Sequence, residues 1–269
     1  MIMNCKNCYT ELQEGFDYCS SCGGKVVRKR LTLKNLFEHL SETFFNYDNK
    51  LLRTIIDLCK KPEDVIATYI DGVRKRYVNP ISFFGLSLTL SGLSVFLIQK
   101  FYLEYFDIVA WMSSLEIFNN PASQKALANY SASDTMEYSS LIYSAIVPVF
   151  GLISWVVFWD KKYNFTEHIV IYLYSMSLVS IFSVVAGQII LLLNPTFYIT
   201  FIFLTYPIIL LYHCYLLKRI FDLSKLELFV KTILFLAIFF VLYVILGIVS
   251  FIMGFVTGQY NIEDFKPKA

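Results

Sequence analysis

Charged side chains are scarce in this chain of 269 residues: they make up 16% of it, whereas hydrophobic residues make up 57%. A soluble domain usually carries about 25% charged residues. The net charge is only +2, so the chain lacks the excess of positive charge that is typical of nucleic-acid binders. No nucleic-acid partner is therefore expected. The apolar excess lies in long uninterrupted runs, which indicates a membrane protein.

Signature motifs of catalytic sites are missing as well. The sequence contains no His-Glu-x-x-His, no Gly-x-Ser-x-Gly and no phosphate-binding loop. Residues 1–10 contain no apolar core of the kind that a secretory signal needs, so a cleaved signal is not expected. These absences together predict a protein that is not an enzyme.

The N-terminal segment is, by contrast, rich in cysteine. Two Cys-x-x-Cys pairs, Cys5 with Cys8 and Cys19 with Cys22, account for four of the six cysteines. A two-residue gap lets one tight turn direct both thiolates at one ion, and two such turns supply the sulfurs of a tetrahedral, structural Zn²⁺ site. A disulfide-linked or redox-active pair is the alternative, but cytoplasmic thiols are kept reduced. We therefore expect a zinc ribbon over residues 1–27.

The residues between and after the two pairs fit a small fold that depends on its metal. The insert from Tyr9 to Tyr18 suits a short hairpin with Gly15 near its turn. Gly23 and Gly24 follow the second pair, where a residue without a Cβ adopts positive φ easily. So short a segment has too few apolar side chains for a core of its own. Metal binding must therefore supply most of its folding free energy.

Residues 28–80 are predicted to form a basic linker and amphipathic helices on the cytoplasmic side. The basic segment 26–30 is either a solvated tether or a contact for anionic lipid head groups. Two apolar stripes at helical spacing follow, and then a third helix with Pro62 at its first position and Gly72 as its stop. Whether these helices pack together or lie on the membrane stays open. The stripes consist of Leu33, Leu36, Phe37, Leu40 and Phe44, and of Leu51, Leu52, Ile55, Ile56 and Cys59.

Five apolar runs occupy most of residues 81–269, and none of them contains Asp, Glu, Lys or Arg. Each is long enough to cross a hydrocarbon core of roughly 30 Å at about 1.5 Å per residue. The expected fold is an all-α polytopic membrane protein with five transmembrane helices. The runs are about 81–98, 141–159, 169–193, 197–217 and 232–256.

The segments around these runs alternate in charge. Segment 99–140 is acidic, with an interfacial helix predicted near its start, and segment 194–196 is neutral. The C-terminal tail is mixed, and the segment before the first run and the two remaining connections are basic. The positive-inside rule therefore predicts five spans with a cytoplasmic N-terminus and an outside C-terminus, in a plasma (inner) membrane. The basic connections contain Arg74, Lys75 and Arg76; Lys161 and Lys162; and Lys218, Arg219, Lys225 and Lys231.

Several stretches of the first third of the chain resemble a known sequence group. They are Cys-Lys-Asn-Cys and Tyr-Cys-Ser-Ser-Cys-Gly in the head, and segments 51–54, 57–58, 62, 69–72 and 74–80 after it. Together they are similar to an uncharacterised bacterial family, a domain-of-unknown-function group in which a short zinc-ribbon head precedes a multi-span membrane domain. The resemblance implies that architecture, and it implies no reaction.

Few polar side chains in the spans suggest chemistry. His213 is the one ionisable side chain within the five runs, and its neighbour Cys214 diverges from it by about 100° on a helix, so a structural role is favoured over a site. Gln188 is expected to donate a hydrogen bond between helices. Either Asn164 or Thr166 is expected to cap the third span.

The cysteine-rich N-terminal segment is a candidate binding module, and the five apolar runs without charged residues are a candidate membrane anchor. Together they predict an integral membrane scaffold or adaptor that presents the zinc ribbon to a cytoplasmic protein partner. The alternative is a permease or lipid-handling protein for a neutral or amphiphilic substrate, since polar and proline residues within the spans would allow a path. The expected partners are the lipid bilayer and the protein that binds the ribbon, and association with a second copy stays open.

Overall fold

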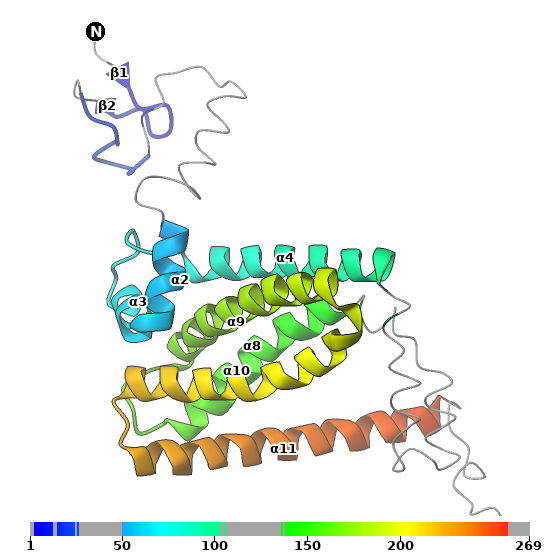
Figure 1. The fold of residues 1–269 in the computed structure, drawn as a ribbon. Helices are drawn as coiled ribbons and strands as arrows, with labels where there is room; N and C mark the ends of the chain where they lie inside the picture. The colour runs from blue at the N-terminus through cyan, green and yellow to red at the C-terminus, as the bar shows by residue number, and fades with distance from the viewer. Residues whose placement is uncertain are drawn as a thin grey trace, which may run out of the picture. The chain divides into compact units, whose positions relative to one another are not determined.

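A computed structural model describes residues 3–12, 15–24, 26, 50–102, 105, 136 and 138–257. The chain divides into two compact units, Met1–Lys50 and Leu51–Ala269. The described part of the first unit up to residue 26, here called the head, contains two short strands. The second unit contains the long helices (Figure 1). The predicted helix over 33–44 lies outside the described residues, as does most of segment 99–140.

Two short strands frame the first cysteine pair in the head. β1 (Met3–Asn4) and β2 (Glu11–Leu12) are antiparallel, with Met3 opposite Leu12 and Asn4 opposite Glu11. The hairpin predicted within the insert is therefore replaced by one in which the Cys5–Cys8 turn is the connection. Gly15 therefore follows this hairpin and does not lie at its turn, although its φ of +91° is one that glycine adopts readily.

Among the described residues of the second unit, five helices are long and apolar enough to cross a membrane, in agreement with the predicted number. They run in alternating directions, so that neighbours along the chain are antiparallel (Figure 1). A short 3-10 turn, η3 (Pro195–Phe197), leads into the fourth. The five helices are α4 (Pro80–Phe101), α8 (Ser139–Val157), α9 (Phe165–Leu193), α10 (Tyr198–Phe221) and α11 (Lys225–Val256).

Capping residues make two helices longer than their apolar runs. Asn164 and Glu167 form a capping box, so α9 starts at Phe165, and the cap is Asn164 rather than Thr166. Ser224 and Glu227 form a second capping box that starts α11 well before its apolar run. Each box satisfies backbone N–H groups that have no partner inside the helix, so the helix extends beyond the hydrocarbon-length run.

Helix α9 is central and packs against α4, α8 and α10. Its buried side chains include Tyr172 and Tyr174 as well as small serines. Close approach to α8 is possible because Gly151 has no side chain: a Cβ there would lie 3.1 Å from Ile169 Cγ1. Small residues of this kind let membrane helices approach closely and gain packing contacts.

Helix α11 lies at the edge of the helical bundle. None of its most apolar window is buried, compared with 33% for α9. Its main attachment is aromatic, since Phe235 and Phe239 pack edge-on against Phe150 of α8 at ring-centroid distances of 5.6 and 5.5 Å. Most of the α11 surface is therefore left for lipid.

Two short helices pack on one end of the bundle. α2 (Lys50–Lys60) buries Thr54 and Leu58, and α3 (Pro62–Ile70) buries Val65 and Ile66 and contacts α9 and α10. Of the second predicted stripe, Leu51 and Ile55 pack against the core, whereas Leu52, Ile56 and Cys59 are exposed. The following helix begins at Pro62, as predicted, and ends at Ile70, with the predicted stop residue Gly72 two positions later at a φ of +100°.

Candidate metal centre and charged end of the bundle

The first cysteine pair lies in a tight turn closed by two backbone hydrogen bonds. The N–H of Cys5 donates to Thr10 O over 2.9 Å, and the N–H of Tyr9 donates to Cys5 O over 2.8 Å. Tyr9 has a φ of 60°, which is uncommon for a residue with a bulky side chain. The turn therefore holds its two thiols in place at some cost in backbone strain.

The second cysteine pair repeats the same turn. Cys19 N–H donates to Gly24 O and Gly23 N–H donates to Cys19 O, both over 2.9 Å. Gly23, with a φ of +67°, occupies the position that Tyr9 occupies in the first turn. Gly24 has no positive φ, contrary to expectation. It serves close approach instead, because a Cβ there would lie 3.4 Å from the sulfur of Cys22.

The two turns bring the four predicted cysteine sulfurs together. Cys5 Sγ lies 3.7 Å from Cys22 Sγ, and Cys8 Sγ lies 3.6 Å from Cys19 Sγ. All four sulfurs lie within 4.8 Å of one another. A Zn–S distance of about 2.3 Å in tetrahedral geometry separates the sulfurs by about 3.8 Å. The cluster therefore has the size and the donor set of a tetrahedral metal site.

Polar groups around the sulfurs lower the pKa of Cys8 and Cys22, whereas the pKa of Cys19 is raised. The backbone N–H of Asn7 donates to Cys5 Sγ over 3.4 Å, and its side-chain amide donates to Cys22 Sγ over 3.5 Å. The hydroxyl of Thr10, 3.3 Å from Cys8 Sγ, lowers the pKa of the Cys8 thiol to about 6. Separations of 3.6–3.7 Å far exceed the roughly 2.05 Å of a disulfide bond, so these cysteines are free thiols.

A second polar assembly surrounds the connection between α3 and α4 (residues 71–79, here called the junction), which precedes the first span. Val78 N–H donates to Thr54 Oγ1 over 3.0 Å, and the hydroxyl of Tyr174 donates to Val78 O over 2.7 Å. Tyr77 donates to Asp57 over 2.9 Å. Burial raises the pKa of Tyr77, and this bond to the carboxylate raises it further. The junction is thus fixed both to α2 and to α9.

The end of the junction caps the first span. Asn79 Oδ1 accepts from Ile81 N–H over 2.9 Å, and the Asn79 amide donates to the hydroxyl oxygen of Tyr69 over 3.3 Å. The guanidinium groups of Arg74 and Arg76 lie 5.8 Å and 5.2 Å from the ring centroids of Tyr69 and Tyr77. The two predicted topology-setting arginines are therefore exposed and held against aromatic rings at the entrance to α4.

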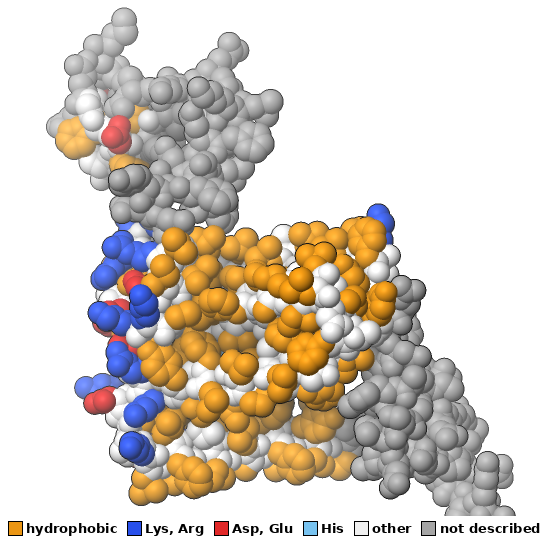
Figure 2. All heavy atoms as spheres, viewed as in Figure 1, with side chains coloured by type: hydrophobic (Ala, Val, Ile, Leu, Met, Phe, Trp, Pro, Cys, Tyr) orange, Lys and Arg blue, Asp and Glu red, His pale blue; other side chains and the backbone are white. Residues whose placement is uncertain are grey.

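Basic residues gather at one end of the bundle, with α2 and α3 (Figure 2). In the described part of unit Leu51–Ala269, every Lys and Arg except Lys100 belongs to α2, α3 or the connections and helix ends beside them. We call this the charged end. Its cations are Arg53, Lys60, Lys61, Arg74, Lys75, Arg76, Lys161, Lys162, Lys218, Arg219, Lys225 and Lys231.

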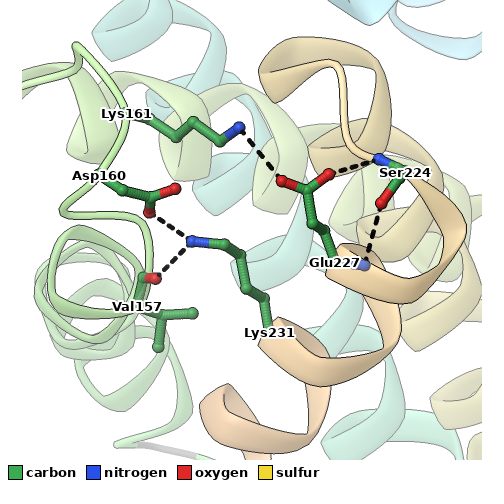
Figure 3. A network of polar contacts seen from close by, with 6 residues as sticks. All are labelled: Val157, Asp160, Lys161, Ser224, Glu227 and Lys231. Carbon is green, nitrogen blue, oxygen red and sulfur yellow. Dashed lines mark hydrogen bonds and ion pairs between the residues drawn. The ribbon is translucent and has the colours of Figure 1, made fainter.

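Two ion pairs tie the start of α11 to the α8–α9 connection (Figure 3). The Lys231 amine donates to Asp160 and also to Val157 O over 3.0 Å. Lys161 lies 4.0 Å from Glu227, whose carboxylate also belongs to the cap of α11. Lys231 lowers the pKa of the Asp160 carboxyl through its hydrogen bond. These polar contacts add to the few aromatic contacts that hold α11 against α8.

A further ion pair joins α3 to α10. Arg219 donates two hydrogen bonds to the Glu63 carboxylate, one from Nε over 3.1 Å and one from a terminal nitrogen. Arg219 lowers the pKa of Glu63. Two tyrosines of α10 also bind the end of α2: Tyr215 donates to Lys60 O over 2.8 Å, and Tyr212 donates to Leu58 O over 3.3 Å.

Inside the bundle, the expected interhelical bond of Gln188 is confirmed, since its amide donates to Ser94 Oγ over 2.6 Å. A second buried histidine was not singled out from the sequence. The Asn164 cap starts α9 before the apolar run and places His168 in the first turn, where it is fully buried and its Nδ1 lies 2.9 Å from Ser154 Oγ. The capping signal alone could have placed His168 inside the helix.

Comparison with known proteins gives one match. No curated protein and no solved structure matches the chain. Residues 48–92, which cover α2, α3, the whole junction and the first half of α4, match the sequence model of a family described as a protein of unknown function (DUF3667). The chain is thus similar, over this segment, to an uncharacterised family, as the resemblance over segments 51–80 indicated.

Proposed function

We propose that the protein is an integral scaffold of a bacterial plasma membrane, which holds a zinc-bearing head in the cytoplasm for a protein partner. The charged end supports the proposed orientation, in which the head and α2 and α3 lie on the cytoplasmic side, because connections rich in Lys and Arg remain on that side. Segment 27–49 contains no apolar run long enough to cross the membrane. The head therefore stays on the same side as α2 and α3.

The four cysteines support a structural ion in this proposal. Four thiolates fill a tetrahedral coordination shell and leave no position for a substrate. Residues Cys5, Cys8, Cys19 and Cys22 would hold Zn²⁺, which would tie the two turns into one small fold. A head of this kind presents a rigid surface to a partner, and the proposal assigns it no catalytic step.

Affinity capture of the full chain in mild detergent tests the role of the head. The variant with Cys19→Ser and Cys22→Ser should lose its partner along with its zinc, while the amount of inserted protein stays the same. The matched control is Cys59→Ser with Cys214→Ser, which changes two cysteines outside the cluster and should keep both. Loss of zinc with the partner retained would contradict the adaptor role.

A tag after residue 269, probed from outside intact cells, tests the orientation. The tag should be accessible without permeabilisation, because five spans with a cytoplasmic start end outside. Replacing Arg74, Lys75 and Arg76 by neutral residues should mix the two orientations. A tag that is protected until the cells are permeabilised would overturn the proposed topology.

A further inference from the structure

A cavity of about 160 Å³ lies between α10 and α11, with α8 and α9 behind it. At its rim, Tyr206, Leu210 and Leu236 are 62%, 41% and 41% exposed. Since α10 and α11 are both candidate spans, an opening between them faces the hydrocarbon of the bilayer. The walls are mainly apolar and include Phe150, Tyr172, Leu217, Phe235 and Phe239.

Among the buried polar side-chain atoms of the described residues that line this cavity, one nitrogen lacks a hydrogen-bond partner. Lys231 donates to Asp160 and to a backbone carbonyl, and Cys214 Sγ lies 3.6 Å from Thr232 Oγ1. His213 is different, because its Nε2 is buried and has no hydrogen-bond partner among the described residues. A buried nitrogen without a hydrogen-bond partner costs free energy. A ligand that forms a hydrogen bond with this nitrogen would therefore gain binding free energy.

The other ring nitrogen of His213 decides which kind of group is missing. Nδ1 lies 2.9 Å from the carbonyl oxygen of Ile209. A carbonyl oxygen only accepts hydrogen bonds, so Nδ1 carries the proton and, in the neutral ring, Nε2 presents a lone pair. The unmet demand at Nε2 is therefore for a hydrogen-bond donor.

We propose that this cavity binds the hydroxyl end of a neutral, single-chain lipid alcohol, whose O–H donates to Nε2 of His213. The chain would leave through the rim between α10 and α11 into the bilayer. Nε2 has less than 1 Å² of exposed surface of its own, so the hydroxyl must displace a side chain that now covers it. This site is separate from the metal centre and adds a ligand to the scaffold role.

Size and chemistry exclude two-chain lipids, ionised fatty acids and esters. A cavity of about 150 Å³ holds one benzene molecule, so this one admits the end of one chain and not two chains. An ionised carboxylate or an ester has no hydrogen to donate to a lone pair. A carboxylate would also have to displace Asp160 to reach the Lys231 amine.

Photolabelling of the full chain in phosphatidylcholine vesicles tests the proposal. The probe is a long-chain primary alcohol with a diazirine a few carbons from its hydroxyl, and peptide mass spectrometry locates the label. Labelling is expected on segments 206–217 and 231–239. Unlabelled alcohol should compete about three- to tenfold better than its methyl ether, which has no donor. Equal competition by the ether, or stronger competition by the matching fatty acid, would overturn the proposal.

Two variants sharpen the result. His213→Phe keeps a ring against Tyr172, on which His213 now stacks with ring centroids 5.9 Å apart, but removes the acceptor, so alcohol and ether should compete equally. Ser183→Ala, in a separate cavity between α9 and α10, should keep the preference. A preference that survives His213→Phe, or a label confined to the Ser183 cavity, would contradict the site. If His213→Phe does not fold, the ranking of competitors on the unchanged chain decides.

Discussion

The head and the helical bundle are stabilised in opposite ways. Within the described residues of the head, the buried hydrophobic side chains are the cysteines Cys5 and Cys19, so little apolar burial is available without an ion. The bundle buries a large cluster that includes Leu58, Phe83 and Ile171. The comparison teaches that one chain combines a head with almost no apolar core, whose cysteine cluster we propose a metal stabilises, with a bundle that is stabilised by packing. Each can therefore be disrupted without the other.

The largest expected effect is on the head. Cys19→Ser with Cys22→Ser removes two of four ligands, so zinc should fall from one per chain to none, and residues 1–27 should unfold because metal binding supplies their folding free energy. Metal analysis and cysteine alkylation of the purified chain measure this. The thermal unfolding of the helices should not change. Full zinc stoichiometry in the variant would contradict the site.

The next largest effect is on the bundle. Gly151→Leu places a side chain against Ile169, where a Cβ would already lie 3.1 Å from Cγ1 and 3.4 Å from the backbone nitrogen. Overpacking of this kind costs about 1–3 kcal/mol, which unfolding in detergent should detect. Gly247→Leu is the control, because a Cβ there meets nothing within 4 Å. Zinc content should be unchanged in both variants. Equal effects of both would contradict the α8–α9 packing.

A smaller, stabilising effect is expected in the head. Tyr9→Gly replaces a residue that has a φ of 60° by one that adopts this conformation freely, as Gly23 does at the equivalent position. The relief of strain is worth about 1 kcal/mol, so zinc affinity should rise roughly fivefold. Competition with a chelator measures it. Gly23→Ala should lower the affinity, and an increase with that control would contradict the equivalence of the two turns.

The smallest effect concerns the ion pairs at the charged end. Asp160→Asn should destabilise the bundle by less than about 1 kcal/mol, since a partly exposed ion pair contributes little. Lys231 lowers the pKa of Asp160 from its ordinary 3.8, so this contribution is present above that value and is lost as the pH falls through the lower, folded-state pKa. Unfolding at pH 7 and at acid pH measures it.

The control for the ion pair is Asp222→Asn. Asp222 ends α10 with a φ of 47°, a conformation that asparagine adopts readily. Its stability should match the unchanged chain at both pH values. A loss of stability at pH 7 as large as that of Asp160→Asn would show that the effect is general to the charged end and does not come from the Lys231 pair.

Much of this architecture could be predicted from the sequence. The Cys-x-x-Cys spacing predicted the four sulfurs that cluster, because two-residue gaps restrict the turn, and the apolar runs predicted five long helices. Hydropathy could not predict which helix is central. α11 is more apolar than α9, yet α9 is the buried one, because in lipid the helix with serines, tyrosines and histidine gains more from facing protein.

The tertiary contacts were also beyond the sequence. Nothing local indicates that Leu52 and Ile56 of α2 would be exposed while Thr54 is buried, because the backbone N–H of Val78 provides the partner of Thr54. In the same way, His213 appeared to be filler at the sequence level. Its significance depends on the carbonyl of Ile209 and on a cavity shared with α11, which only the packed helices create.

Hydrogen exchange on the full chain in lipid, before and after a zinc chelator, tests the separation of the two regions most directly. The account predicts that amides of residues 3–24 lose protection when the metal is removed, while those of α4, α8 and α9 keep it. Restoring zinc should restore protection in the head. Unchanged protection of the head after the metal is gone, or a loss of protection in the helices with it, would contradict the account.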